Sequence, residues 1–161
     1  VSYEMPQWLA SPTNLNSVVD SLREISILAG RYYTGGATPP NFGDNVNATG
    51  ITFCDQDCTF TGAGGGIMVV TGKLTLHGNF NFNGLILVTG TQGIRRTGGG
   101  NGTLQGNVVV APYDPLNLSA PFGAPQYDLS GGGNSTITYN SSSLSNGLVA
   151  VSNFVMGVAE K

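Results

Sequence analysis

The chain has 161 residues, only 9% of them charged, and a formal net charge of −3. This length favours one domain over residues 1–161, with a surface made mostly of uncharged polar groups. The acidic balance excludes nucleic-acid binding, because Arg95-Arg96 is the one adjacent basic pair, and no apolar run is long enough for a membrane-spanning helix.

The first predicted element is an amphipathic helix over 15–29. Apolar residues recur there at 3.6-residue spacing: Leu15, Val18, Val19, Leu22, Ile25, Leu28 and Ala29. Three polar residues can cap its start: Ser11, Thr13 and Asn14. Gly30 ends the helix, and Asp20 can pair with Arg23 on its polar face. We expect this helix to pack on the main body of the protein; the alternative is a helix that binds a partner.

Residues 1–50 are expected to hold this helix and a loop, and two cysteines follow in the stretch CDQDC. A fully extended chain would hold the Cα atoms of Cys54 and Cys58 roughly 13 Å apart, whereas a disulfide needs them within about 7 Å. The intervening residues, Asp-Gln-Asp, are suitable for the turn that would bring them together. We predict a Cys54–Cys58 disulfide formed in an oxidising compartment. The alternative is two free thiols flanking a loop, while a metal site is disfavoured because the chain has a single His.

Short β segments follow one another from about residue 51, and one of them is repeated. The stretch GIMVVTG returns as GLILVTG and, more weakly, as GNVVVAP. These copies begin at Gly66, Gly84 and Gly106, at spacings of 18 and 22 residues. A period of about 20 residues built of short strands is typical of a parallel β-solenoid, in which the copies stack about 4.8 Å apart. We therefore predict a mainly β fold with a short solenoid over 51–142, right-handed by the crossover rule.

The segments KLTL and FNFN are expected to form the other two sides of one coil. Alternation directs four side chains into the coil: Leu74, Leu76, Phe80 and Phe82. It directs their neighbours outward: Lys73, Thr75, Asn81 and Asn83. Glycine supplies the backbone conformations that the corners need. The longer second spacing predicts a loop at TGGGNG, residues 97–102.

An irregular, proline-rich insertion over 111–131 is expected to interrupt the solenoid before residues 131–141 return to a β pattern. Open coil ends would present unpaired strand edges, so both ends need a cover. The N-terminal helix is a candidate for one end. Residues 143–161 form the predicted C-terminal capping segment, with a short helix near 143–151 and a strand near 153–159.

The ionisable residues match no catalytic or metal-binding motif, so we predict no catalytic, cofactor-binding or metal-ligating residue. Asp55 and Asp57 can bind calcium or act as an acid/base pair on a solenoid, but a solvated turn is favoured. Asp114 and Asp128 are expected to form turns, and His77 to make a hydrogen bond at a coil corner.

Two adjacent arginines follow the stretch Gln-Gly-Ile at 92–94. One of Arg95 and Arg96 is expected to point to solvent and the other to stack on a neighbouring coil. An anion contact is the alternative. The glycine run that follows lacks the Gly-Lys-Ser/Thr ending of a phosphate-binding loop.

Five β motifs in one order resemble the C-terminal domain of PilX-type, type IV pilus-associated proteins from bacteria. They are GGIMVVTG, KLTLHGN, FNGLILVTG, GNGTLQGNVVVA and GGNSTITYNS, and together they cover roughly residues 60–142. The resemblance implies an extracytoplasmic protein at the cell surface, in a pilus or in the periplasm, whose partners are other pilus or envelope proteins. Such proteins are usually tethered by an N-terminal apolar helix, which this chain lacks. The resemblance implies no enzymatic chemistry.

We therefore expect a non-catalytic structural or assembly component associated with type IV pili. One alternative is a carbohydrate-binding or carbohydrate-cleaving β-helix protein, which would use exposed aromatic faces. The candidates are Tyr32, Tyr33, Tyr113, Phe122 and Tyr127. The other alternative is a scaffold that forms filaments by stacking coil on coil. A helix covering one end would argue against that scaffold.

Overall fold

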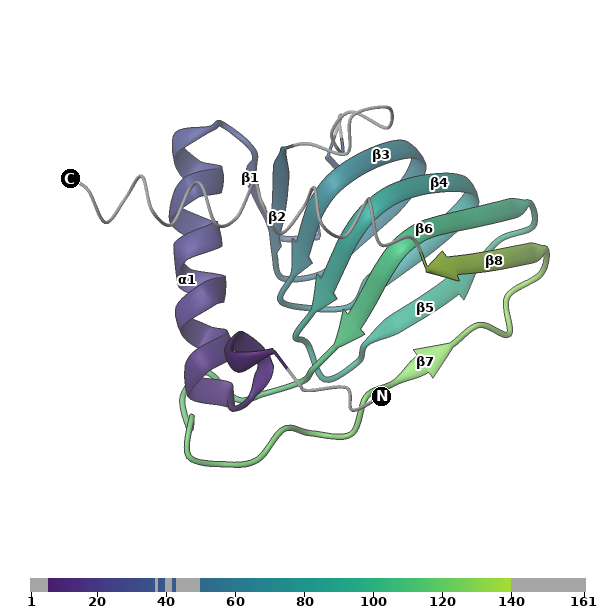
Figure 1. Cartoon of the computed structure of the whole chain (residues 1–161). Helices are drawn as coiled ribbons and strands as arrows, with labels where there is room; N and C mark the ends of the chain where they lie inside the picture. The colour runs from purple at the N-terminus through teal and green to yellow at the C-terminus, as the bar shows by residue number, and fades with distance from the viewer. Residues whose placement is uncertain (1–5, 37, 40–41, 43–49, 140–161) are drawn as a thin grey trace.

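The computed structural model describes residues 6–36, 38–39, 42 and 50–139, without the side chains of 137–139. It begins with a short 3-10 helix, η1 (Gln7–Leu9), and one α-helix, α1 (Pro12–Leu28). The strands follow in this order: β1 (Tyr32–Thr34), β2 (Ile51–Asp55), β3 (Cys58–Val70), β4 (Leu74–Val88), β5 (Ile94–Thr97), β6 (Asn101–Val110), β7 (Tyr127–Asp128) and β8 (Asn134–Tyr139). The described strands pair in parallel and wind into a solenoid of about three turns, as the sequence predicted (Figure 1).

The sequence repeat is a stack of strands in register. Gly66 lies opposite Gly84 in the ladder of β3 and β4, and Gly84 lies opposite Gly106 in the ladder of β4 and β6. The predicted alignment of the three copies is therefore confirmed. A further copy precedes them, since Ile51 of β2 lies opposite Ile67 of β3. This copy was not predicted from the sequence, because ITFC shares little but its first residue with IMVV.

The change of spacing along the repeat arises at two corners. Leu74 lies opposite Ile94, 20 positions later, whereas Phe80 lies opposite Gly102, 22 positions later. The corner before β5 and the bend between β5 and β6 thus each take extra residues. The loop predicted at 97–102 is present but shorter, over 98–100 between β5 and β6, and it accounts for only part of the difference.

The strands are longer than the short segments that the sequence suggested. The stretches CTFT and IMVV lie in the one strand β3, and KLTL, FNFN and LILV contribute to the one strand β4. Both strands bend at glycines with positive φ, which are Gly62 and Gly66 in β3 and Gly78 and Gly84 in β4. At the corner where Gly66 stacks on Gly84 the ladder continues without a break, whereas the register shifts between Phe60 and Gly62.

The inside of the coil is the predicted apolar column. Leu74, Leu76, Phe80 and Phe82 are all buried. Their outward neighbours keep contact with solvent, as alternation predicted. Phe60 of the preceding coil meets Phe82 edge to face, with ring centroids 5.7 Å apart. Aromatic side chains of successive coils therefore stack in the interior.

The strand layer that carries the repeat is buried on both faces. Met68 and Val70 point into the coil, whereas Ile67 and Val69 point outward and belong to a second apolar cluster with α1. This explains the four consecutive apolar residues of IMVV, because a strand covered on both sides has no polar face. The α1 side of the cluster consists of Leu15, Val19, Leu22 and Ile25.

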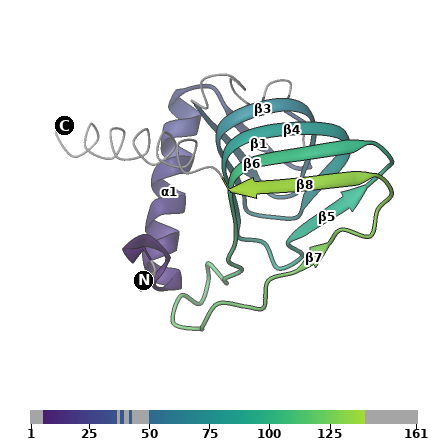
Figure 2. The same cartoon turned by 45° about the vertical axis from the view of Figure 1, so that its right-hand side comes forward.

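The helix accordingly lies along the side of the solenoid and crosses several strands (Figures 1 and 2). Packing on the main body is confirmed, but the suggested cover for a coil end is wrong. The apolar outer face of β2, β3 and β4 is what the helix covers, because that face would otherwise meet water. The argument against coil-on-coil stacking that depended on a capping helix is therefore lost.

The start of α1 follows the predicted capping chemistry. The Ser11 hydroxyl accepts a hydrogen bond of 3.1 Å from the backbone N–H of Asn14. The helix begins at Pro12, earlier than expected, since proline fits the first turn. The predicted ion pair of Asp20 with Arg23 forms on the polar face. No helix among the described residues has the length and apolarity that crossing a membrane requires.

Two segments outside the repeat also hold the solenoid. Residues 32–34 were expected in a loop, but they form β1, which pairs with β2 and stacks the ring of Tyr32 on that of Phe53. The insertion after β6 passes below the first turns of α1 before it returns to β7 (Figure 2). There the hydroxyl of Tyr113 donates a 2.9 Å hydrogen bond to the side-chain oxygen of Asn16. The predicted helix and strand of 143–161 lie outside the described residues.

Candidate functional site

Asp55, at the end of β2, is held by three side chains from different elements. Its carboxylate accepts hydrogen bonds from the Tyr32 hydroxyl (2.6 Å), the Thr71 hydroxyl (2.8 Å) and Nε of Arg23 (3.2 Å). Burial alone would raise the pKa of Asp55, but these hydrogen bonds and the charge of Arg23 lower it below its ordinary value. The expectation of a solvated turn is wrong for this residue, whose side chain is only 24% exposed. Asp55 ties α1 and β1 to the solenoid.

Asp57 has a different environment, so the two carboxylates do not form a pair. Its side chain is more than half exposed and accepts a 2.8 Å hydrogen bond from the backbone N–H of Lys73. Asp57 therefore fits the predicted turn. Nowhere in residues 6–36, 38–39, 42 and 50–139 do three His, Cys, Asp or Glu side chains gather as metal ligands.

Cys54 and Cys58 meet inside the coil, as the proposed turn requires. Gln56, between them, has a φ of 109°, and its backbone N–H donates to the Thr71 hydroxyl. The two sulfurs lie 2.8 Å apart as free thiols, and both residues are buried. The hydrogen bond with Cys54, together with burial, raises the pKa of the Cys58 thiol. The turn is confirmed, and the disulfide stays a prediction.

The two adjacent arginines point in opposite directions, as predicted. Arg96 is buried and lies 4.8 Å from the centroid of the Phe80 ring of the preceding coil. Its guanidinium donates to the carbonyl oxygens of Gly78 (2.8 Å) and Gly100 (2.9 Å), which lie in two stacked corners. The side chain of Arg95 is exposed. Arg96 therefore supports the coil.

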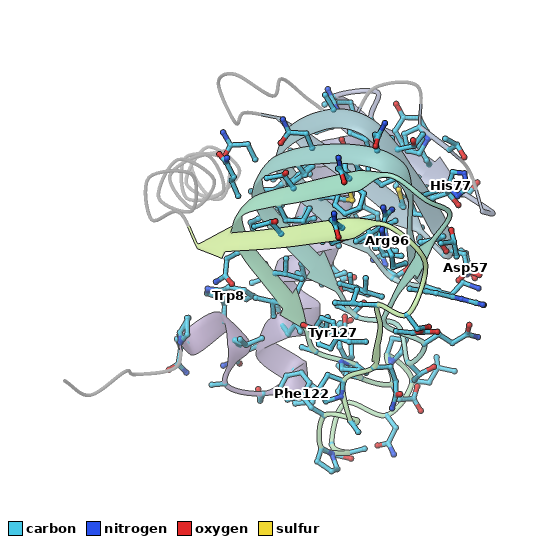
Figure 3. The ribbon with its side chains drawn as sticks, turned by 90° about the vertical axis from the view of Figure 1, so that its right-hand side faces the viewer. Trp8, Asp57, His77, Arg96, Phe122 and Tyr127 are labelled. Carbon is cyan, nitrogen blue, oxygen red and sulfur yellow. The ribbon has the colours of Figure 1, made fainter. Side chains whose placement is uncertain are left out.

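His77 and Asp114 also take the roles expected from the sequence. Nδ1 of His77 lies 3.1 Å from the hydroxyl of Thr97 at a corner of the coil. Figure 3 shows His77 and Asp57 toward the outside of the coil and Arg96 within it. The carboxylate of Asp114 accepts a 2.9 Å hydrogen bond from the backbone N–H of Leu116, which forms the predicted turn.

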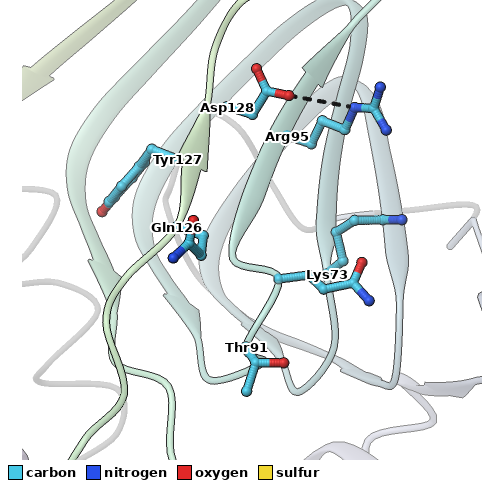
Figure 4. A pocket seen from close by; sticks show the side chains of 7 residues that line it. Lys73, Thr91, Arg95, Gln126, Tyr127 and Asp128 are labelled. Atoms are coloured by element: carbon cyan, nitrogen blue, oxygen red, sulfur yellow. Dashed lines mark ion pairs between the residues drawn. The ribbon is translucent and has the colours of Figure 1, made fainter.

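A surface pocket of about 340 Å³ opens where β5 and β7 lie side by side. Figure 4 shows Lys73 and Arg95 on one side of it and Gln126 and Tyr127 on the other. The remaining lining residues are Thr91, Gln92 and Asp128. The pocket thus combines an aromatic ring, amide groups and charged groups on one open surface.

Each of the two cationic side chains at this pocket has a carboxylate oxygen just beyond hydrogen-bonding distance. Nε of Arg95 lies 3.8 Å from a carboxylate oxygen of Asp128, and Nζ of Lys73 lies 3.9 Å from one of Asp57. Hydrogen bonds from Ser130 lower the pKa of Asp128, so its carboxylate is charged at neutral pH. Burial raises the pKa of Tyr127, which keeps its hydroxyl protonated.

Comparisons of the chain with protein-family models, curated proteins and solved structures find no match. The site is therefore interpreted from its own geometry.

Only some of the residues that form this pocket could be singled out from the sequence. Tyr127 was a candidate aromatic face, and Asp128 was expected in a turn, which its hydrogen bonds from Ser130 form. The amides of Gln92 and Gln126 were missed. Gln92 lies in the corner before β5 and Gln126 lies in the long insertion directly before β7, and only the pairing of β5 with β7 brings them together.

Proposed function

We propose that this chain is a non-catalytic, extracytoplasmic structural component associated with bacterial type IV pili. In this proposal the solenoid presents a rigid surface to other pilus or envelope proteins. The observation that carries it is the strand layer of β2, β3 and β4, which is packed on one face by the interior of the coil and on the other by α1.

This double packing supports a role in which shape is preserved. Close-packed interiors resist deformation, so strands held on both faces keep their spacing when the surface is loaded. The charged groups next to this layer also preserve its shape, because Asp55 binds α1 through Arg23 and β1 through Tyr32. These interactions favour a scaffold over a mobile catalytic site.

The composition of the surface favours contacts with other proteins. Charged residues are depleted in the cores of protein interfaces, because removing a charge from water is costly. With 9% charged residues, this chain offers broad areas of uncharged polar surface. Such a surface can be buried against a partner at a low desolvation cost.

The link to pili is based on the five motifs that resemble PilX-type proteins. Four of them contribute to β3, β4 and β6, and the fifth contributes to β8. They thus occupy consecutive layers of one stack. This arrangement fits a domain whose sequence is constrained by stacking, with the function carried by its outer surface.

Fractionation of pili tests the proposal. Pili are sheared from cells of the source organism, and the protein is measured by immunoblot in the sheared, periplasmic and cytoplasmic fractions. We expect it in the sheared or periplasmic fraction, with its amount in the sheared fraction reduced in a strain that lacks the pilus assembly ATPase. Recovery in the cytoplasm alone would contradict the proposal.

The gene sequence upstream of the codon for Val1 provides an independent test. An apolar helix preceded by a prepilin-type cleavage site is the expected result. A long soluble domain at that place would instead contradict an association with pili.

A further inference from the structure

We propose that the pocket between β5 and β7 binds a neutral saccharide, with Tyr127 as the stacking surface for a sugar ring. This site is independent of the association with pili. The chemistry required is an apolar sugar face against an aromatic ring, with hydrogen-bonding groups at the edge of the ring to meet the hydroxyls.

The aromatic ring is available for such a contact. Tyr127 is 49% exposed although it is a large side chain at the edge of a strand layer. It belongs to β7, whose backbone is held in the ladder by Ile94 of β5. The backbone that carries the ring is therefore positioned by the solenoid. A rigid aromatic side chain loses little conformational entropy when it binds.

The polar groups around the ring have unused hydrogen-bonding capacity. Within the part of the chain that the structure describes, no hydrogen bond engages the side chains of Thr91, Gln92 and Gln126 or the hydroxyl of Tyr127. Amides and hydroxyls both donate and accept, as sugar hydroxyls do. Their convergence on one pocket of about 340 Å³ favours a hydroxyl-rich ligand of the size of one or two sugar units.

The charges favour a neutral saccharide over an acidic one. Arg95 lies beside Asp128, and Lys73 lies beside Asp57, so each cation has a carboxylate close to it. At 3.8 and 3.9 Å these pairs are too long for direct hydrogen bonds. Donors of the two cations and an oxygen of Asp128 therefore remain free to meet adjacent hydroxyls, while an acidic sugar would meet the carboxylate of Asp128.

Affinity gel electrophoresis of the full chain tests the site. The protein migrates in native gels that contain dextran, galactomannan, xyloglucan or, as the acidic comparison, polygalacturonate. We expect at least one of the three neutral polysaccharides to retard the wild-type protein. Tyr127→Ala should weaken this binding at least about tenfold, because the stacking surface is lost. Tyr127→Phe should bind within about threefold of wild type, because it keeps the ring.

Leu116→Ala is the matched control, since Leu116 is a 96% exposed apolar residue that does not line the pocket. It should bind as wild type does, and far-UV circular dichroism and thermal melting should show that every variant is folded. Three results would each overturn the proposal. They are equal retardation of wild type and folded Tyr127→Ala, retardation by polygalacturonate alone, and no retardation by any of the three neutral polysaccharides.

Discussion

Gly84 of β4 lies directly opposite Gly66 of β3, at a point where the two coils approach so closely that Gly84 has no room for a side chain. A Cβ built on Gly84 would overlap the carbonyl oxygen of Gly66. The φ of Gly84 is 146°, a conformation that residues with a side chain rarely adopt. The repeat therefore keeps glycine at this place for a steric reason.

Gly84→Ala should consequently destabilise the protein by about 3 kcal/mol or more, from backbone strain and the overlap together. Gly99→Ala is the matched control, because a Cβ on Gly99 would meet no atom within 4 Å. Urea denaturation followed by circular dichroism measures both. If the two substitutions have similar midpoints, the close approach of the coils is not what requires glycine.

The neighbouring arginines Arg95 and Arg96 should differ sharply in their contribution to stability. Arg96 is 2% exposed and donates to carbonyl oxygens of two corners. Arg96→Ala removes the hydrogen bonds of the guanidinium to both corners and the packing on Phe80, so a loss of about 3 kcal/mol is expected. Arg95→Ala should change stability by less than about 0.5 kcal/mol, because its one ion pair is exposed and long. Urea denaturation followed by circular dichroism measures the stability of both variants. Equal losses of stability would show that the buried guanidinium is not needed for folding.

Asp55 should make stability depend on pH in the acid range. Its pKa is lower in the folded protein than its ordinary value, so the folded state holds the charged form more strongly than the unfolded chain does. The resulting stabilisation is complete above the ordinary value, about 3.9, and is lost as the pH falls through the lower value of the folded protein. Asp55→Asn removes this dependence.

The measurement is the melting temperature of wild type and Asp55→Asn between pH 2.5 and pH 7, a range set by the ordinary carboxyl value of about 3.9. We expect Asn to cost about 1–2 kcal/mol at pH 7 and the two curves to converge toward acid pH. Asp128→Asn is the control, since its pKa is also lowered but its carboxylate bonds locally to Ser130. Parallel curves for wild type and Asp55→Asn would show that the charge of Asp55 does not stabilise the fold.

The thiols of Cys54 and Cys58 are expected to be joined in protein purified from an oxidising compartment. Their turn brings both sulfurs to one point inside the coil, so oxidation needs no rearrangement of the backbone. Intact mass spectrometry without reductant should give a mass lower by two hydrogen atoms than that of the reduced protein. Alkylation under denaturing conditions should then modify neither cysteine, whereas a reduced sample should take up two alkyl groups. Alkylation of both cysteines before reduction would contradict the disulfide.

The sequence predicted the stack and a helix packed on it, but not which face of the stack the helix covers, and the strands show why. The alternation of KLTL and FNFN assigned one face to the interior, and the register places Leu74 and Phe80 there. IMVV does not alternate, which indicates burial on both faces, yet the identity of the second cover depends on tertiary packing. The surface pocket was harder to predict than the cover of the strand layer. Part of its lining lies in an irregular insertion whose length bears no relation to the coil period, so the approach of Gln92 to Gln126 has no signal in the sequence.

The second cover can be tested on α1 itself. Leu22 is buried against the outer face of the strand layer, whereas Leu28, on the same helix, is 86% exposed. Leu22→Ala should cost about 3 kcal/mol through the lost apolar contact and the cavity that remains. Leu28→Ala should change stability by less than about 0.5 kcal/mol, since alanine preserves helix propensity and no packing is lost. Hydrogen exchange should show faster opening of α1 in Leu22→Ala, with the ladder between β3 and β4 protected longer than the helix. If both leucines prove equally dispensable, the helix does not stabilise the outer face, and the proposal of a scaffold packed on both sides loses its basis.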